Sequence, residues 1–185
     1  SAIFQRLHGQ WIGANLIRRA FEKCGIANYW GAFTGESHKV KGWSDKGLIA
    51  APTVKALGAS TCCGAAMMAS VRELQTRKEE RRIAVIFSDG SFNGNHQAWD
   101  EDADEYRSAN DFCKEAWAEG IEVYYIGIHV SDSEIEYAER LLGKGHAAGV
   151  TDIATELPAL LNTIIEMDER DLRKTAEGKG YKLKR

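Results

Sequence analysis

The chain has 185 residues, a length typical of one globular domain with one hydrophobic core. Its 24 Lys and Arg against 27 Asp and Glu give a net charge of −3, which argues against a general polyanion binder, so we expect no nucleic-acid partner. No apolar run approaches the roughly 20 residues that span a bilayer, and no charged-then-apolar secretory signal opens the chain, so we expect a soluble protein without membrane contact.

Helical periodicity opens the chain. Apolar residues recur every three to four positions from Ile3 to Cys24, which predicts an amphipathic helix that Gly25 ends in the left-handed conformation. The aromatic-rich segment 26–33 predicts a strand. A second, short strand near residues 38–43 is expected within the glycine-containing stretch 34–60.

Helices and strands alternate in the rest of the chain. The continuous apolar runs are typical of strands buried on both faces. Such strands are predicted over 83–87 and 121–128, with a last short strand over 149–153. Helices are predicted over 62–76, 104–119, 131–142 and 157–172. This alternation predicts an α/β fold of three layers, with a doubly wound, mostly parallel sheet between helices.

The domain is expected to cover residues 1–177. The remaining residues, 178–185, carry four basic side chains and no acid, which predicts a mobile basic tail.

The four cysteines are expected to be reduced, buried thiols. They form no C-x-x-C pair and have no structural-zinc spacing with histidine. Adjacent cysteines rarely bridge each other, because disulfide geometry is demanding. A cytoplasmic location follows from reduced thiols. The four residues are Cys24, Cys62, Cys63 and Cys113.

Ligands bind doubly wound sheets beyond the carboxyl ends of the strands, so the loops at those ends are the candidate site. The small-residue turn 58–66 places the hydroxyls of Ser60 and Thr61 before a helix, where simple capping is the ordinary explanation. Asp89 and Gly90 follow a buried strand, where the carboxylate would point into the crevice or form an Asp-Gly turn. The acidic run 100–105 suits a solvated helix start and lacks the calcium-loop pattern.

The order of these elements resembles a von Willebrand factor type A domain over nearly the whole chain. The stretch 61–66 (TCCGAA) resembles that family's second metal-site loop, 87–90 (FSDG) its third, and 120–128 (GIEVYYIGI) its fifth strand. Within the family, 19–26 (RAFEKCGI) and 30–34 (WGAFT) are similar to the C-terminal domain of cobaltochelatase CobT-type proteins.

The resemblance implies a metal-ion-dependent adhesion site. In the family, an Asp and two Ser of a D-x-S-x-S loop, then a Thr and an Asp, hold a divalent cation such as Mg²⁺ or Mn²⁺, and an acidic group of the partner completes the shell. Oxygen ligands of this kind suit a hard cation. Thr61 and Asp89 match the last two ligands, and Ser91 is a candidate helper.

The D-x-S-x-S loop and the first strand of the family are missing here. That strand is central in the family's sheet, between the strands matching 26–33 and 83–87, and its loss would leave backbone groups unpaired. The two flanking strands would pair directly, a partner chain or second copy would add a strand, or the chain is a fragment. We favour a fragment, because the family loop commonly ends in Met and a start there would give Ser1.

A second placement of the metal loops remains open. Residues 89–93 read D-x-S-x-N, close to the missing first loop. The later threonine would then be Thr151 or Thr155, neither preceded by a Gly-Ser or Gly-Gly turn, so we favour the first placement.

The leading functional hypothesis is a noncatalytic protein-binding domain with an incomplete adhesion site. The CobT-type resemblance implies a hexameric AAA+ ATPase as partner, or a place as subunit of a metal-chelatase complex. With most ligands missing, we expect weak or no Mg²⁺ or Mn²⁺ binding by this chain alone.

Two other function classes remain. An enzyme is disfavoured, because the sequence has no G-x-S-x-G elbow, P-loop or G-x-G-x-x-G, and its best lone catalytic candidate is His129 beyond a strand end. A structural or assembly protein would complete its incomplete sheet with a partner strand.

Overall fold

The computed structural model describes residues 2–33, 37–45 and 62–166. A three-stranded parallel sheet forms the centre, in the order β3 (Arg82–Ser88), β6 (Ile121–Ile128) and β7 (Ala147–Val150). The prediction of an α/β fold with a parallel sheet is confirmed in this part of the chain. The strand expected over 121–128 matches β6 residue for residue.

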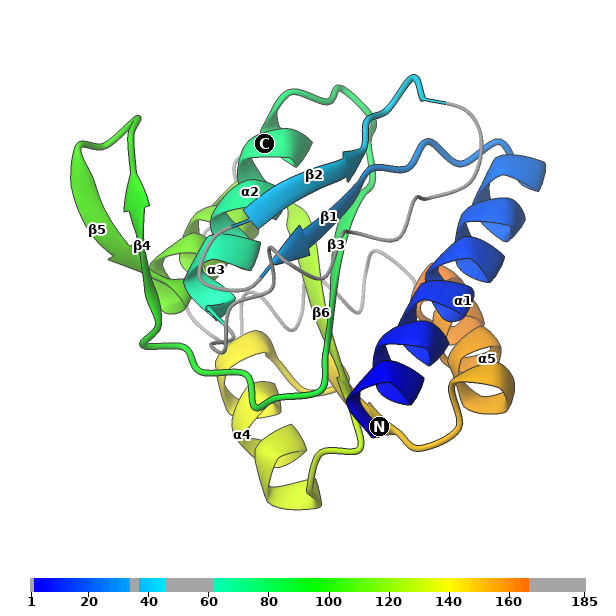
Figure 1. Ribbon diagram of the computed structural model, residues 1–185. Coiled ribbons are helices and arrows are strands. Elements are labelled where there is room, and N and C mark those ends of the chain that lie inside the picture. Colours follow the sequence, from blue (N-terminus) through cyan, green and yellow to red (C-terminus); the bar gives the residue numbers. More distant parts are fainter. Residues whose placement is uncertain (1, 34–36, 46–61, 167–185) are drawn as a thin grey trace.

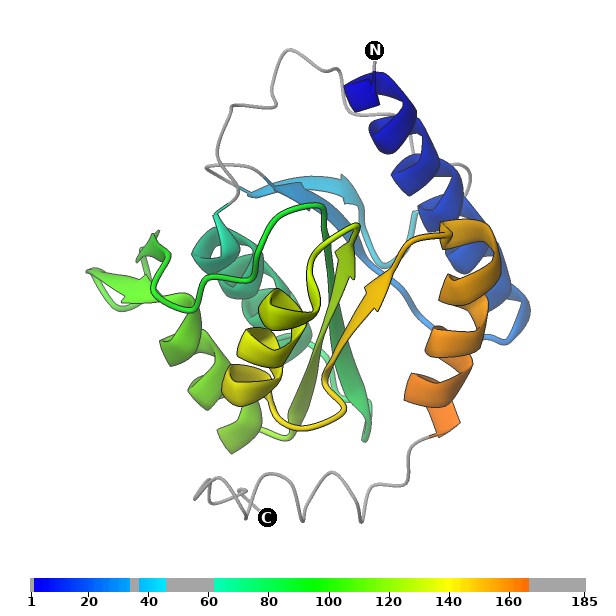
Figure 2. The ribbon, with the colours of Figure 1, turned by 90° about the horizontal axis from the view of Figure 1, so that it is seen from below.

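Helices cover both faces of this sheet (Figures 1 and 2). On one face lie α2 (Cys63–Gln75), α3 (Ala109–Ala118) and α4 (Asp132–Leu142), and on the other lie α1 (Ala2–Lys23) and α5 (Ile153–Glu166). All eight residues of β6 are buried. Because successive strand residues point to opposite faces, Val123 and Tyr125 pack toward the first layer, whereas Tyr124 and Ile126 pack toward the second.

Helix ends follow local sequence signals. Gly25 takes the expected left-handed conformation, with φ +71°, and the Ile26 N–H donates to the Phe21 carbonyl at 2.8 Å, as in a Schellman ending. At the start of α4, Ser131 and Glu134 form the predicted capping box. Among the described residues, no helix is both long enough and apolar enough to cross a membrane.

The first strand is shorter than predicted. β1 covers only Trp30–Phe33 and pairs with β2 (Ser37–Lys41) in a separate antiparallel sheet. The Asn28 amide donates to the Ile26 carbonyl at 3.1 Å and accepts from the Trp30 indole at 3.0 Å. Such local bonds compete with strand pairing. Within the described chain β1 does not pair with β3, so direct pairing of the two flanking strands is not observed there.

The helix predicted over 104–119 begins only at Ala109, because a hairpin precedes it. The hairpin joins β4 (Gln97–Asp100) to β5 (Glu105–Ser108) and projects from the body of the domain (Figure 1). A capping box between Ser108 and Asp111 sets the later helix start. The interpretation of the acidic run as a solvated helix start is therefore wrong: the run turns the hairpin, and its first member, Asp100, is buried.

The cysteines are all free thiols, as expected, but not all are buried. Cys63 and Cys113 are buried, Cys62 is half-buried and Cys24 is exposed after the end of α1. Burial raises the pKa of the Cys63 thiol. The boundary expected between the domain and the basic tail, at residues 177 and 178, lies outside the described residues.

Candidate functional site

The loop 89–96 follows the carboxyl end of β3, and side chains of β6 and α2 hold it in place. The Tyr125 hydroxyl of β6 donates to the Gly90 carbonyl, and the Cys63 thiol at the start of α2 donates to the Ser91 carbonyl at 3.7 Å. Phe92 is fully buried, with its ring centroid 5.5 Å from that of Tyr125. The loop is therefore anchored to β6 by the side chain of Tyr125 and to α2 by the thiol of Cys63.

Two of the three predicted metal residues lie on this loop. Asp89 is exposed directly after β3, and its carboxylate has no hydrogen bond within the described part of the chain. Ser91 is two residues further on and also exposed. Thr61 lies outside the described residues, next to the segment that starts α2. The structure thus brings Asp89 and Ser91 to one edge of the sheet.

Ser91 is joined to α4, which sequence reasoning did not foresee. Its hydroxyl donates to one carboxylate oxygen of Glu134, while the other oxygen accepts from the Ser131 backbone at 2.7 Å and hydroxyl at 2.8 Å. These hydrogen bonds lower the pKa of Glu134. The capping-box pattern identified Glu134 as a helix-start residue, but no local signal indicates a contact 43 residues away.

The oxygen atoms of Asp89 and Ser91 do not by themselves make a cation site. The proton of the Ser91 hydroxyl is committed to Glu134. No group of three or more His, Cys, Asp or Glu side chains that could hold a metal ion occurs among the described residues. A Mg²⁺ ion prefers six oxygen ligands in octahedral geometry, so Asp89 and Ser91 would leave most of the shell to water or to other groups.

We expect millimolar Mg²⁺ or Mn²⁺ to raise the melting temperature by less than about 2 °C, because two protein oxygens give little binding energy. Thermal unfolding with and without each cation measures the shift, and Asp89→Ala is compared with Glu80→Gln, which removes an exposed acid elsewhere. A shift above about 4 °C that Asp89→Ala removes and Glu80→Gln keeps would contradict the expectation.

The alternative placement of the metal loops is not supported by the strand order. Thr151 follows β7, and β6 separates β7 from β3, which carries Asp89 at its end. The Thr151 hydroxyl donates instead to Glu156 at 3.0 Å, at the start of α5. His129, the lone catalytic candidate, is exposed in a left-handed conformation with φ +57°, and its backbone N–H donates to the Val150 carbonyl at 3.0 Å.

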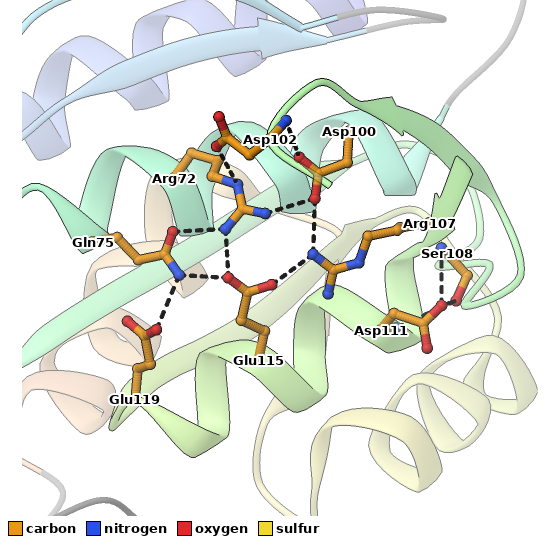
Figure 3. A network of polar contacts seen from close by, with 9 residues as sticks. All are labelled: Arg72, Gln75, Asp100, Asp102, Arg107, Ser108, Asp111, Glu115 and Glu119. Atoms are coloured by element: carbon orange, nitrogen blue, oxygen red, sulfur yellow. Dashed lines mark hydrogen bonds and ion pairs between the residues drawn. The ribbon is translucent and has the colours of Figure 1, made fainter. Parts of the chain in front are cut away.

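A buried ion-pair network fixes the neighbouring β4–β5 hairpin (Figure 3). Asp100 of β4 is 1% exposed and accepts from Arg72 of α2 at 2.6 Å and from Arg107 of β5 at 2.8 Å. Glu115 of α3 bridges the same two arginines, with 2.7 Å to Arg107. Ion pairs between alternating acidic and basic side chains therefore connect α2 and α3 to both strands of the hairpin.

Burial works to raise the pKa of Asp100, but the hydrogen bonds from Arg107 and Arg72 outweigh it and hold that pKa below its usual range. The pKa of Glu115 is lowered in the same way, against burial, by Gln75, Arg107 and Arg72. The guanidinium groups of Arg107 and Arg72 also lie 4.6 and 5.9 Å from the centre of the Phe112 ring. Nothing local in the sequence indicates this network, because its partners come from four elements.

The network makes stability depend on acid pH. Both carboxyl groups have a lower pKa folded than unfolded, so unfolding takes up protons, and their contribution is present above about pH 5 and lost as pH falls through the folded pKa values. We expect the free energy of unfolding to fall from pH 5 to pH 3 more steeply in the native sequence than in Asp100→Asn. Urea unfolding at each pH measures both slopes, and equal slopes would contradict the prediction.

No family model and no curated protein matches this chain. Among solved structures, it is similar to proximal thread matrix protein 1 from the mussel byssus, with a TM-score of 0.56 and 13% sequence identity. The match covers 85% of this chain and 39% of that one, so the chain spans well under half of that protein. At this identity the likeness is evidence of fold alone: the chain has a mixed α/β fold, compatible with a Rossmann-like architecture, in which helices flank a three-stranded parallel sheet.

Proposed function

We propose that this chain is a noncatalytic protein-binding domain of the von Willebrand factor A type, related to the C-terminal domain of CobT-type proteins. It acts in the cytoplasm with an AAA+ ATPase and contacts that partner at the carboxyl edge of the sheet. The observation that carries the proposal is the gathering of Asp89, Ser91 and the start of α4 at this edge.

The chemistry of the edge suits a contact between proteins better than a reaction. Asp89 is exposed, and its carboxylate accepts no hydrogen bond within the described residues, so it is available to a partner's Lys or Arg side chain. The loop beside it is held by Phe92 and Tyr125, so little ordering entropy would be lost on binding. None of the hydrogen bonds in the described chain joins the His129 imidazole to a serine or cysteine nucleophile.

The test mixes the chain with the purified AAA+ subunit of a cobaltochelatase and ATP, and measures complex formation by size-exclusion chromatography and interferometry. We expect a complex that Asp89→Ala weakens by about 10-fold, the loss of one charged contact. Glu80→Gln, an exposed acid before β3, is the matched control and leaves the affinity unchanged. No complex would refute the ATPase partner, and an unaffected Asp89→Ala complex would refute the site.

A second candidate function, strand capture, is favoured by the outer edge of β3. Among the described strands β3 pairs with β6 alone, and Val85 and Phe87 are only half-buried, unlike the fully buried residues of β6. Trp30 of β1 packs with the cluster on the α1 and α5 face, and Phe33 with the cluster on the other face. β1 therefore shares the layer of the sheet without hydrogen bonds to β3.

On this candidate, an extended strand of a partner chain or a second copy pairs with the unpaired groups of β3. Sedimentation velocity over a range of concentrations distinguishes the two sources. A second copy gives a mass that rises with concentration and slows hydrogen exchange of the β3 amides. A constant monomer mass, with β3 amides protected as well as those of β6, would contradict strand capture.

A further inference from the structure

The outer face of the β4–β5 hairpin carries two exposed aromatic side chains. Trp99 and Tyr106 are direct cross-strand partners, 43% and 67% exposed. Their ring centroids lie 5.1 Å apart with an interplanar angle of 69°. The neighbouring residues Ala98 and Asp100 are buried, and strand residues alternate between faces, so both rings lie on the side away from the buried face.

The rings are not needed to hold the hairpin on the domain. That role falls to the opposite face, where Asp100 binds Arg72 and Arg107. A cross-strand aromatic pair stabilises a hairpin by about 0.2–1 kcal/mol. This small stabilisation does not explain why two large rings are exposed to water. Because the network fixes the backbone beneath them, the rings form a rigid, preorganised surface of the kind that binds at low entropic cost.

The charge around the rings selects the partner. Glu101 and Asp104 at the hairpin turn are exposed and have no ion pair within the described part of the chain. Arg72 and Arg107 both pair with the buried Asp100 and therefore do not neutralise these carboxylates. Aromatic faces attract cations, Arg above all, and exposed carboxylates add to that attraction.

We propose that this hairpin face, Trp99 and Tyr106 beside Glu101 and Asp104, is a docking surface for an arginine-bearing segment of a partner protein. The guanidinium group stacks on an aromatic ring while a carboxylate at the turn pairs with its charge. The aromatic pair carries the proposal, and the acidic residues define the partner's chemistry. The proposal uses neither Asp89 nor Ser91, so it stands or falls independently of the proposed function.

The test uses a fluorescent peptide of alternating glycine and arginine, and the same peptide with citrulline, which keeps the shape of arginine but lacks its charge. We expect the full chain to bind the arginine peptide and to bind the citrulline peptide at least about 10-fold more weakly, in fluorescence anisotropy at low salt. Trp99→Thr with Tyr106→Thr should weaken binding by a similar factor, since threonine preserves strand propensity but removes both rings.

Two further variants separate docking from general attraction to acids. Glu101→Gln with Asp104→Asn weakens binding several-fold, whereas Glu80→Gln with Glu136→Gln, which removes the same charge elsewhere on the surface, does not. Circular dichroism and thermal unfolding verify that each variant is folded. The proposal is overturned if the native chain does not bind, if citrulline binds equally, if the threonine variant binds as the native chain does, or if both charge variants weaken binding alike.

Discussion

Asp100→Ala should lower the free energy of unfolding by about 3–5 kcal/mol, the usual cost of removing one partner from a buried ion pair. Asp100 is 1% exposed and binds two arginines, so its loss leaves Arg107 with Glu115 and leaves Arg72 with Glu115 and the exposed Asp102. Urea unfolding followed by circular dichroism measures the change.

The matched control is Asp102→Ala. Asp102 pairs with the same Arg72, at 3.2 Å, but its side chain is 78% exposed, so we expect a loss below about 1 kcal/mol. Equal losses in the two variants would show that burial does not set the strength of this network.

Phe92→Ala should cost about 3–5 kcal/mol, because it empties a fully enclosed aromatic site. Phe92 is 0% exposed and packs edge-on against Tyr125, the residue whose hydroxyl holds the Gly90 carbonyl. The cavity would therefore open directly beneath the loop that carries Asp89. Chemical unfolding measures the loss of stability. A weaker affinity in the complex assay would indicate that the loop is displaced.

Two controls frame this prediction. Phe92→Leu keeps most of the volume and should cost less than about 1.5 kcal/mol. Leu16→Ala removes an apolar side chain that is 55% exposed on α1 and should change stability by about 0.5 kcal/mol or less. A Phe92→Ala loss no larger than that of Leu16→Ala would mean that Phe92 does not anchor the loop.

The parts of the fold that follow from sequence are those with a local cause. The apolar run of β6 and the capping box of α4 are local patterns, and both elements occur where predicted. The β4–β5 hairpin was missed because its acidic turn also suits a helix start, and only the distant Arg72 explains why Asp100 is buried.

The candidate site divides in the same way. The position after a buried strand predicts Asp89 as a site residue, and the von Willebrand factor A resemblance adds Ser91 as a candidate helper. The structure places both at the expected edge. The contacts that hold them, from Tyr125 and Glu134, join residues 35 and 43 positions apart and have no local pattern. The one available signal was Phe92, a large apolar residue within an otherwise polar loop.

The pairing of α1 with α5 on one face of the sheet has a consequence for biosynthesis. Ile17 of α1 and Leu161 of α5 belong to one buried cluster with Tyr124 and Ile126 of β6. Since the ribosome makes the chain from its N-terminus, α1 emerges long before the helix beside which it packs. That face of the sheet therefore remains open to nonnative association until α5 emerges, which makes the nascent chain a natural client for chaperones.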